Sequence, residues 1–158
     1  MSLGLRQFIQ KHRAKNRPMF LYIFLTFGSI AIDQALKLIL FWQVKEPYLW
    51  SNYFGLFLFK NYQFAFSLPL PTPFVYLIYF FCFVVIGVWL FFMRHKLKPI
   101  DLVAWALVIA GGLSNVGERV ITGYVKDYLF IFSGIFNLAD GLILIGLVIL
   151  LFKGAPNK

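Results

Sequence analysis

Acidic residues are scarce in this chain, and their positions indicate what chemistry it could perform. Asp101 follows a short basic stretch, and the other five are Asp33, Glu46, Glu118, Asp127 and Asp140. Asp127 and Asp140 have no obvious use as ion-pair partners. Two carboxyl groups a few ångströms apart share a proton, so one can deprotonate a water while the other donates a hydrogen bond to a scissile carbonyl. Asp127 and Asp140 are therefore a candidate aspartic-protease pair.

Other hydrolytic chemistries lack the residues that they need. Zinc hydrolysis requires three protein ligands, usually including histidine, and a Ser–His or Cys–His pair requires a histidine base. The two histidines, His12 and His95, lie in basic segments away from the acidic residues. A Ser–Lys pair is possible on paper, from Lys37 with Ser67 or Ser133, although nothing in the sequence brings them together. We therefore expect no metal and no cofactor.

The composition indicates that lipid surrounds most of the protein. Of the 158 residues, 61% are hydrophobic and only 13% are charged, whereas about one quarter of a soluble domain is charged. The net charge of +9 comes mainly from short segments that flank apolar runs, as the positive-inside rule describes. No basic patch interleaves with exposed aromatic residues, so we expect membrane lipids and no nucleic acid as partners.

Four apolar segments are candidates to cross a bilayer, which requires about 20 residues. They cover about 18–41, 72–93, 102–117 and 135–152. The sequence therefore predicts an all-α membrane protein in one integral membrane domain, 1–158, built as a four-transmembrane-helix bundle. The basic segment 1–17, the 94–101 connection and the C-terminus are predicted to be cytoplasmic.

The two remaining connections, 43–71 and about 118–134, must then lie outside the membrane on the opposite side. The first is rich in aromatic and β-prone residues, and its run 54–60 is predicted to be a strand. We expect a small extracytoplasmic β-sheet over about 44–68. Asp127 is placed on the second connection, in a loop that acts as a flexible arm.

This topology gathers polar residues towards the outer side of the membrane. Polar groups in a lipid-embedded bundle are costly and by default mark a functional site. Asp33 and Lys37 are spaced to form a structural ion pair on one helix face, and Glu118 and Arg119 are each expected to pair with neighbouring residues. Residues predicted in the same layer are Asn61, Asn115, Asn137, Asp127 and Asp140.

A proton relay in a small transporter could use the same carboxylates. Transporters often have repeated halves and broken helices near the midplane, and the sequence shows neither. The carboxylates also lie towards one surface of the membrane. We keep the proton-coupled transporter as the alternative function.

Five short motifs, in order along most of the chain, resemble those of lipoprotein signal peptidase, also called signal peptidase II. They are Asp33-Gln34-x-x-Lys37, Asn61-x-x-x-Ala65-Phe66-Ser67, Gly111-Gly112-Leu113-Ser114-Asn115-x-x-Glu118-Arg119, Gly123-x-Val125-x-Asp127-Tyr128 and Phe136-Asn137-Leu138-Ala139-Asp140. The resemblance implies a membrane aspartic endopeptidase of the bacterial cytoplasmic (inner) membrane. Its substrates would be prolipoproteins, cleaved just before a cysteine that carries diacylglycerol.

The resemblance also implies roles for individual residues. Asp127 and Asp140 would be the catalytic dyad. Asp33 would support the architecture, together with Lys37 and Glu118 in the same layer. The residues implied to line the site and hold substrate or dyad geometry are Asn61, Asn115, Arg119 and Asn137.

Three residues depart from the family pattern. The family usually has Asp at the position of Glu118, and it usually has Gly at the positions of Gln63 and Ser114. These changes bear on substrate fit, and they leave Asp127 and Asp140 in place.

Overall fold

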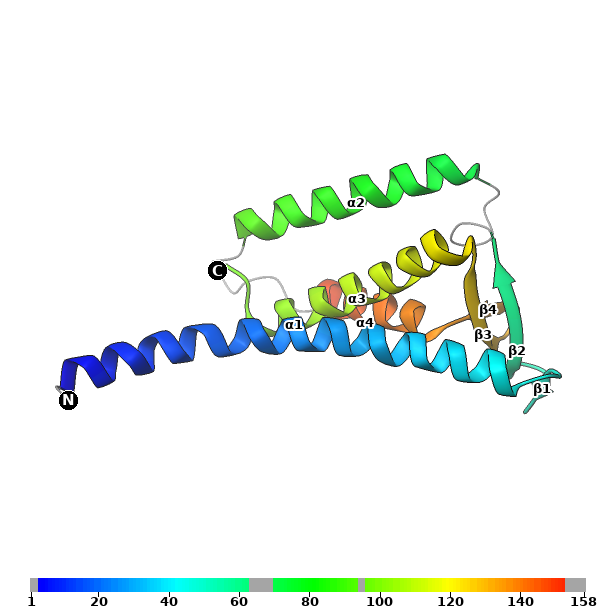
Figure 1. Ribbon diagram of the computed structural model, residues 1–158, viewed down its shortest axis with the longest axis horizontal. Helices are drawn as coiled ribbons and strands as arrows, with labels where there is room; N and C mark the ends of the chain where they lie inside the picture. The colour runs from blue at the N-terminus through cyan, green and yellow to red at the C-terminus, as the bar shows by residue number, and fades with distance from the viewer. Residues whose placement is uncertain (1–2, 63–69, 94–95, 153–158) are drawn as a thin grey trace.

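The computed structural model describes residues 3–62, 70–93 and 96–152, with the backbone alone for 3–18. Within these ranges the chain forms helices α1 (Leu3–Gln43), α2 (Thr72–Met93), α3 (Pro99–Thr122) and α4 (Leu138–Phe152), with a small sheet across one end of them (Figure 1). The ends of α1 and α3 and the start of α4 lie at this sheet. The sheet end of the helices is therefore where distant parts of the sequence converge.

Among the described residues, three helical stretches are long and apolar enough to cross a membrane: Met19–Gln43, Pro73–Met93 and Pro99–Thr122. Helix α4 is also apolar, and 15 of its residues are described. Many large hydrophobic side chains on these helices are exposed, as lipid-facing side chains would be.

The predicted segments and the observed helices differ at their ends. Helix α2 has the predicted bounds, whereas α3 extends beyond 102–117 in both directions and α1 continues back to Leu3. Helix α4 begins at Leu138, because residues 135 and 136 at the start of the predicted fourth segment belong to the strand Gly134–Phe136. Apolar runs predict which residues lipid can surround, but capping and strand pairing decide where a helix begins and ends.

Helix α3 packs against both α1 and α4, and small residues allow the close approach to α4. A side chain at Gly111 would collide with the Ala139 carbonyl, and one at Gly146 would collide with the Ala104 carbonyl. Helix α2 lies apart, with Val75 as its one buried residue among those described. The α1–α3–α4 group is thus the closely packed part of the bundle, and it carries most of the polar residues.

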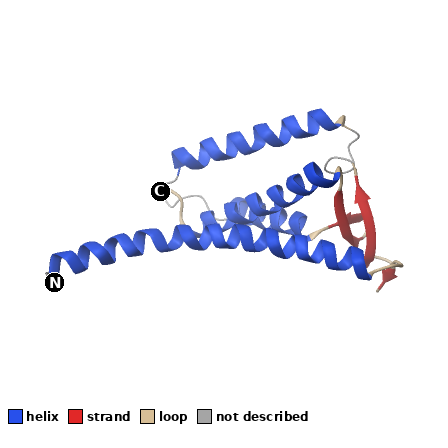
Figure 2. Ribbon diagram, viewed as in Figure 1, coloured by secondary structure: helices blue, strands red, loops and turns tan. Residues whose placement is uncertain are grey.

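The sheet has four antiparallel strands in the order β1 (Tyr48–Leu49), β2 (Phe54–Asn61), β3 (Val125–Ile131) and β4 (Gly134–Phe136) (Figure 2). The strand predicted at 54–60 is confirmed as β2. The expectation that 118–134 is only a connection is wrong, because β3 and part of β4 lie in it. The polar pair Lys126–Asp127 interrupts the apolar pattern of β3, and its pairing with β2 is a contact between distant segments that local sequence does not show.

Candidate active site

Asp127 and Asp140 come together on a strand and a helix. Asp127 lies within β3, opposite Phe59 of β2, so the predicted flexible loop is wrong. The left-handed turn at Gly123, with φ of 84°, ends α3 and directs the chain into β3 four residues before Asp127. Because a paired strand holds its backbone rigidly, Asp127 faces Asp140 from a fixed position.

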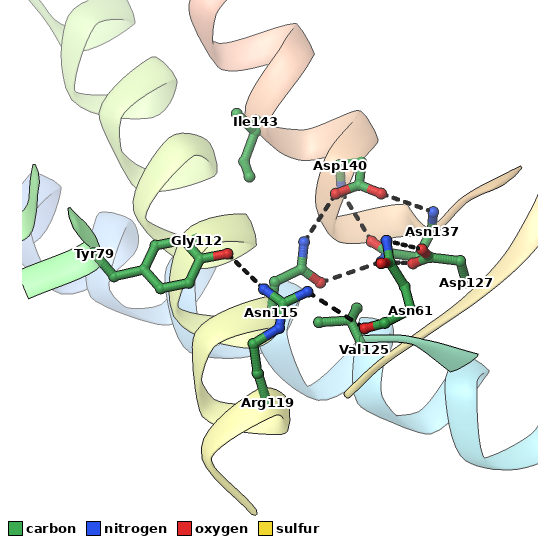
Figure 3. A pocket seen from close by; sticks show the side chains of 10 residues that line it. All are labelled: Asn61, Tyr79, Gly112, Asn115, Arg119, Val125, Asp127, Asn137, Asp140 and Ile143. Carbon is green, nitrogen blue, oxygen red and sulfur yellow. Dashed lines mark hydrogen bonds between the residues drawn. The ribbon is translucent and has the colours of Figure 1, made fainter. Parts of the chain in front are cut away.

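Asn137 connects the two aspartates through its side chain (Figure 3). Its Nδ2 donates to Asp127 Oδ1 at 2.6 Å, and its Oδ1 accepts from the backbone N–H of Asp140 at 3.0 Å. The backbone N–H of Asn137 donates in return to Asp140 Oδ2 at 3.1 Å. This reciprocal pattern is a capping box, in which the residue before a helix and the third residue within it satisfy each other's backbone N–H groups.

Two further residues hold the N-terminus of α4. The Ala139 N–H donates to Asp33 Oδ1, and the Leu138 N–H donates to the Tyr128 hydroxyl oxygen, both at 3.0 Å. The first N–H groups of a helix have no partner within it, so side chains must satisfy them when they are buried. Here α1 and β3 supply those side chains, which fixes the backbone that carries Asp140.

The remaining carboxylate oxygens accept hydrogen bonds from two other asparagines. Asn61 Nδ2 donates to Asp127 Oδ2, and Asn115 Nδ2 donates to Asp140 Oδ1, both at 2.9 Å. Asn115 Oδ1 accepts in turn from Asn137 Nδ2 at 3.2 Å. Three amides therefore orient both carboxyl groups.

Lys37 lies behind this layer and is completely buried. Its Nζ is 2.9 Å from Asp33 Oδ2 and from Glu118 Oε2, and it donates to Asn115 Oδ1 at the same distance. The predicted Asp33–Lys37 pair is confirmed. Lys37 therefore contacts two carboxylates and one amide oxygen, and Ser67, one of the serines considered for a Ser–Lys pair, lies outside the described residues.

Glu118 and Arg119 point in different directions. Glu118 pairs with Lys37 and with Lys126, so the expectation that it pairs with neighbouring residues is confirmed. Arg119 instead donates to the Tyr79 hydroxyl oxygen at 2.6 Å and to the Asn61 carbonyl at 3.4 Å. Consecutive residues on a helix project about 100° apart, so neighbours in sequence rarely share partners.

Ser114, one of the departures from the family pattern, has a specific place. Its Oγ donates to Asp33 Oδ2 at 2.6 Å and accepts from Gln34 Nε2 at 2.8 Å. The hydroxyl therefore ties α3 to α1 directly behind the α4 N-terminus. Gln63 and the Ala65–Ser67 part of the second motif lie outside the described residues.

Burial raises the pKa of Asp127 to about 6. The side chain is 2% exposed, and loss of solvation disfavours the ionised form. The hydrogen bond from Asn61 opposes this shift, the charge of Asp140 adds to it, and Lys37 lowers the pKa from further away. Asp127 can therefore exchange a proton near neutral pH, as a general acid or base must.

A cavity of about 160 Å³ opens beside the two aspartates. Six of the nine predicted site residues line it: Asn61, Asn115, Arg119, Asp127, Asn137 and Asp140. Asp33, Lys37 and Glu118 lie behind these and hold them. Prediction missed the other four lining residues: Tyr79, Gly112, Val125 and Ile143. Tyr79 could have been found, because a hydroxyl in an otherwise apolar helix requires a polar partner.

Two acidic side chains, held by amides beside a cavity at one end of an apolar helix bundle, are the arrangement that a membrane-embedded hydrolase of the aspartic type requires. The chain belongs to the signal peptidase II family: the family described as "Signal peptidase (SPase) II" matches residues 25–155.

Curated relatives of this chain are lipoprotein signal peptidases. The protein from Vibrio cholerae serotype O1 is 33% identical over 127 residues, which cover 70% of this chain and 74% of the relative. The protein from Psychromonas ingrahamii is 32% identical over 147 residues, covering 84% and 83%.

The fold is similar to two solved structures of a bacterial membrane enzyme. One has a TM-score of 0.70 and 23% identity, and covers 87% of this chain and 94% of the other. The second has a TM-score of 0.69 and 20% identity, covering 87% and 93%. At these identities the likeness shows the shared fold.

Proposed function

We propose that this peptidase removes the signal peptide from diacylglyceryl-modified prolipoproteins, just before the lipidated cysteine, with Asp127 and Asp140 as its catalytic dyad. Membership of the signal peptidase II family and the lipoprotein signal peptidases among its relatives support the reaction. The observation that carries the site assignment is the pair of carboxyl groups beside one cavity, joined through Asn137.

The charges of the polar layer favour a dyad that shares one proton. The layer holds four carboxyl groups, on Asp33, Glu118, Asp127 and Asp140, and three cations, on Lys37, Lys126 and Arg119. If every group were ionised, the buried layer would carry one negative charge, which is costly where water is excluded. One proton on the dyad makes the layer neutral.

With one proton shared, each carboxyl group has a distinct task. The ionised group takes a proton from a water molecule, whose oxygen then attacks the scissile carbonyl carbon. The protonated group donates a hydrogen bond to the carbonyl oxygen and its proton reaches that oxygen as the tetrahedral intermediate forms. On collapse, the C–N bond breaks, the group that took the water proton gives it to the leaving amine of the lipidated cysteine, and the other group recovers its proton from the carbonyl oxygen.

Asn61, Asn115, Arg119 and Asn137 support the substrate and the dyad in this proposal. All four line the cavity and combine donors and acceptors that an extended peptide backbone can use. Tyr79 holds the Arg119 guanidinium at the α2 side of the cavity. Asp33, Lys37 and Glu118 support the site indirectly, because they hold the α4 N-terminus and Asn115 in place.

We further propose that all four helices span the bacterial inner membrane as one domain, with both termini cytoplasmic. Helix α4 is about 22 Å long, since each helical residue rises 1.5 Å, and residues 135–137 extend it towards the outer interface. The sheet then lies at the outer surface, where its exposed aromatic side chains suit the headgroup region. The dyad lies near that surface.

Cysteine labelling tests this orientation. In a Cys82→Ser background, Tyr53→Cys should react with a membrane-impermeant maleimide added to intact spheroplasts, and Lys96→Cys should react only after lysis. Tyr53 is exposed in the sheet and Lys96 lies in the turn between α2 and α3. Labelling of Lys96→Cys but not Tyr53→Cys in intact spheroplasts would reverse the orientation and place the dyad on the cytoplasmic side.

The reaction itself is tested by a gel-shift assay with a diacylglyceryl-modified prolipoprotein in detergent. We expect full turnover without an ion gradient, because the dyad needs only water. EDTA should leave the rate unchanged, because the described residues contain no group of three His, Cys, Asp or Glu side chains suited to hold a metal. Turnover that requires a proton gradient would favour the transporter, and loss with EDTA that zinc restores would overturn the mechanism.

A further inference from the structure

Glu118 joins the helices to the sheet at the residue before Asp127. Its Oε2 is 2.9 Å from Lys37 Nζ on α1, and its Oε1 is 2.9 Å from Lys126 Nζ on β3. The backbone N–H of Lys126 also donates to Glu118 Oε2 at 3.2 Å. Both the main chain and the side chain of Lys126 are therefore bound to one carboxylate, which is 1% exposed.

The length of Glu118 matters for this contact. The family usually has Asp here, and Asp is shorter by one methylene group. A carboxylate withdrawn by about one carbon–carbon bond towards α3 could not keep charge-assisted hydrogen bonds of about 2.9 Å to both Lys37 and Lys126. In this chain, the longer side chain of Glu118 is therefore what allows the ion pair with Lys126.

We propose that Lys126 is a positioning residue of the reaction, which acts through Glu118 to hold β3 and the Asp127 carboxyl in place and to balance the charge of the dyad. The inference rests on the proposed catalytic role of Asp127. It adds a residue that neither the sequence motifs nor the cavity lining identified, since Lys126 does not line the cavity.

The charges around Asp127 explain why the lysine matters. The charged groups near Asp127 come from three helices: Asp33 and Lys37 from α1, Glu118 and Arg119 from α3, and Asp140 from α4. The other elements supply two tyrosines and one lysine. These are Tyr79 on α2, Tyr128 on β3, and Lys60 on β2, which is paired with Lys126. Removing the positive charge of Lys126 makes the summed charge of the groups around Asp127 more negative by one unit. A carboxyl group loses its proton less readily near added negative charge, so the pKa of Asp127 should rise.

Lys60 provides a matched control. It is paired with Lys126 across the two strands, but its Nζ lies 5.0 Å from the centre of the Tyr124 ring and Lys60 is exposed. Lys60→Met removes the same formal charge from the same part of the sheet and leaves the Glu118 contact intact. Because solvent screens an exposed charge, Lys60→Met should change the pH profile little.

The experiment measures kcat and KM for prolipoprotein cleavage between pH 4 and 9 for four variants. In Lys126→Met, we expect the acid limb of kcat/KM to move up by about 0.5–1 pH unit and kcat at neutral pH to fall about tenfold, with KM unchanged. Glu118→Asp should have a similar effect, because the shorter side chain moves the carboxylate away from Lys126. Lys126→Arg keeps the charge and should retain the wild-type profile, as should Lys60→Met.

Several outcomes would overturn the proposal. One is a wild-type pH profile and rate in Lys126→Met; another is an equal shift in Lys60→Met. A fall in rate at every pH with no shift of the acid limb would make Lys126 merely structural. If Lys126→Met does not fold, Lys126→Gln and Glu118→Asp carry the same test.

A readout without substrate separates this inference from the proposed function. Carboxyl ¹³C chemical shifts of labelled aspartate in detergent micelles, assigned with Asp127→Asn, report the titration of Asp127 directly. We expect that titration at higher pH in Lys126→Met than in Lys60→Met. If the wild-type enzyme cleaves no prolipoprotein but this difference is seen, the proposed function fails while the positioning contact stands. If the enzyme cleaves and the difference is absent, the positioning role fails alone.

Discussion

Asp127→Asn and Asp140→Asn should each lower kcat by about three to four orders of magnitude, with substrate binding nearly unchanged. Asparagine keeps the shape of the side chain, but it can neither take a proton from water nor hold the shared proton. Because the two residues act as one unit, the double variant should be little slower than either single variant. Single-turnover cleavage of a diacylglyceryl-modified prolipoprotein measures all three.

The control for this prediction is Glu46→Gln. Glu46 is an exposed carboxylate between α1 and β1, so its neutralisation changes the net charge by the same amount without touching the polar layer. Its turnover should equal that of the wild type. Substantial turnover in Asp127→Asn or Asp140→Asn, or a loss that unfolding fully explains, would refute the dyad.

The stability of Asp127→Asn separates loss of chemistry from loss of fold. The folded-state pKa of about 6 lies above the ordinary value of 3.8, so the folded protein holds the proton more tightly than the unfolded chain. The stabilisation from this proton is complete below pH 3.8 and is lost as the pH rises to about 6. At pH 7 the buried charge therefore costs about 3 kcal/mol.

Asparagine removes that cost but accepts fewer hydrogen bonds. Asn61 and Asn137 both donate to Asp127, and an asparagine oxygen faces only one of them, with about 1 kcal/mol lost at the other. The net effect should be a melting temperature at pH 7 equal to or above that of the wild type, measured by thermal unfolding in detergent. A marked drop would show that the ionised carboxylate stabilises the fold.

Lys37→Met should be the most destabilising single change in the polar layer, lowering the free energy of unfolding by about 3–5 kcal/mol. Methionine fills much of the same space, but it leaves the Asp33 and Glu118 carboxylates without their shared cation in a site with no solvent exposure. Asn115 also loses one of the two donors to its amide oxygen, so the orientation of Asp140 should become less well fixed. In Lys37→Met, both turnover and stability should therefore decrease.

Two variants make the Lys37 prediction specific. Lys45→Met removes an exposed lysine from the connection after α1 and should leave the melting temperature unchanged. Adding Asp33→Asn to Lys37→Met removes the carboxylate whose ion-pair partner among the described residues is Lys37, so the double variant should be less destabilised than the sum of its parts. A change below 1 kcal/mol in Lys37→Met would show that neighbouring carboxylates take up protons at little cost.

The sequence alone determined the chemistry that was available and the solvent in which it occurs. Composition indicated lipid, and the near absence of histidine left carboxylates as the candidates for hydrolysis. The spacing of Asp33 and Lys37 predicted their ion pair, because helix geometry places residues four apart on one face. Local rules of this kind apply wherever the interacting residues belong to one helix or one apolar run.

Tertiary structure decided everything that depends on pairing between distant segments. Asp127 lies on a strand because β3 pairs with β2, about 66 residues earlier in the sequence. Glu118 turns to Lys37 and Lys126, and Asn137 caps α4 while it binds Asp127. A carboxylate or amide can satisfy any of several partners, and only the packing of α1, α3, α4 and the sheet determines which partners lie within about 3 Å.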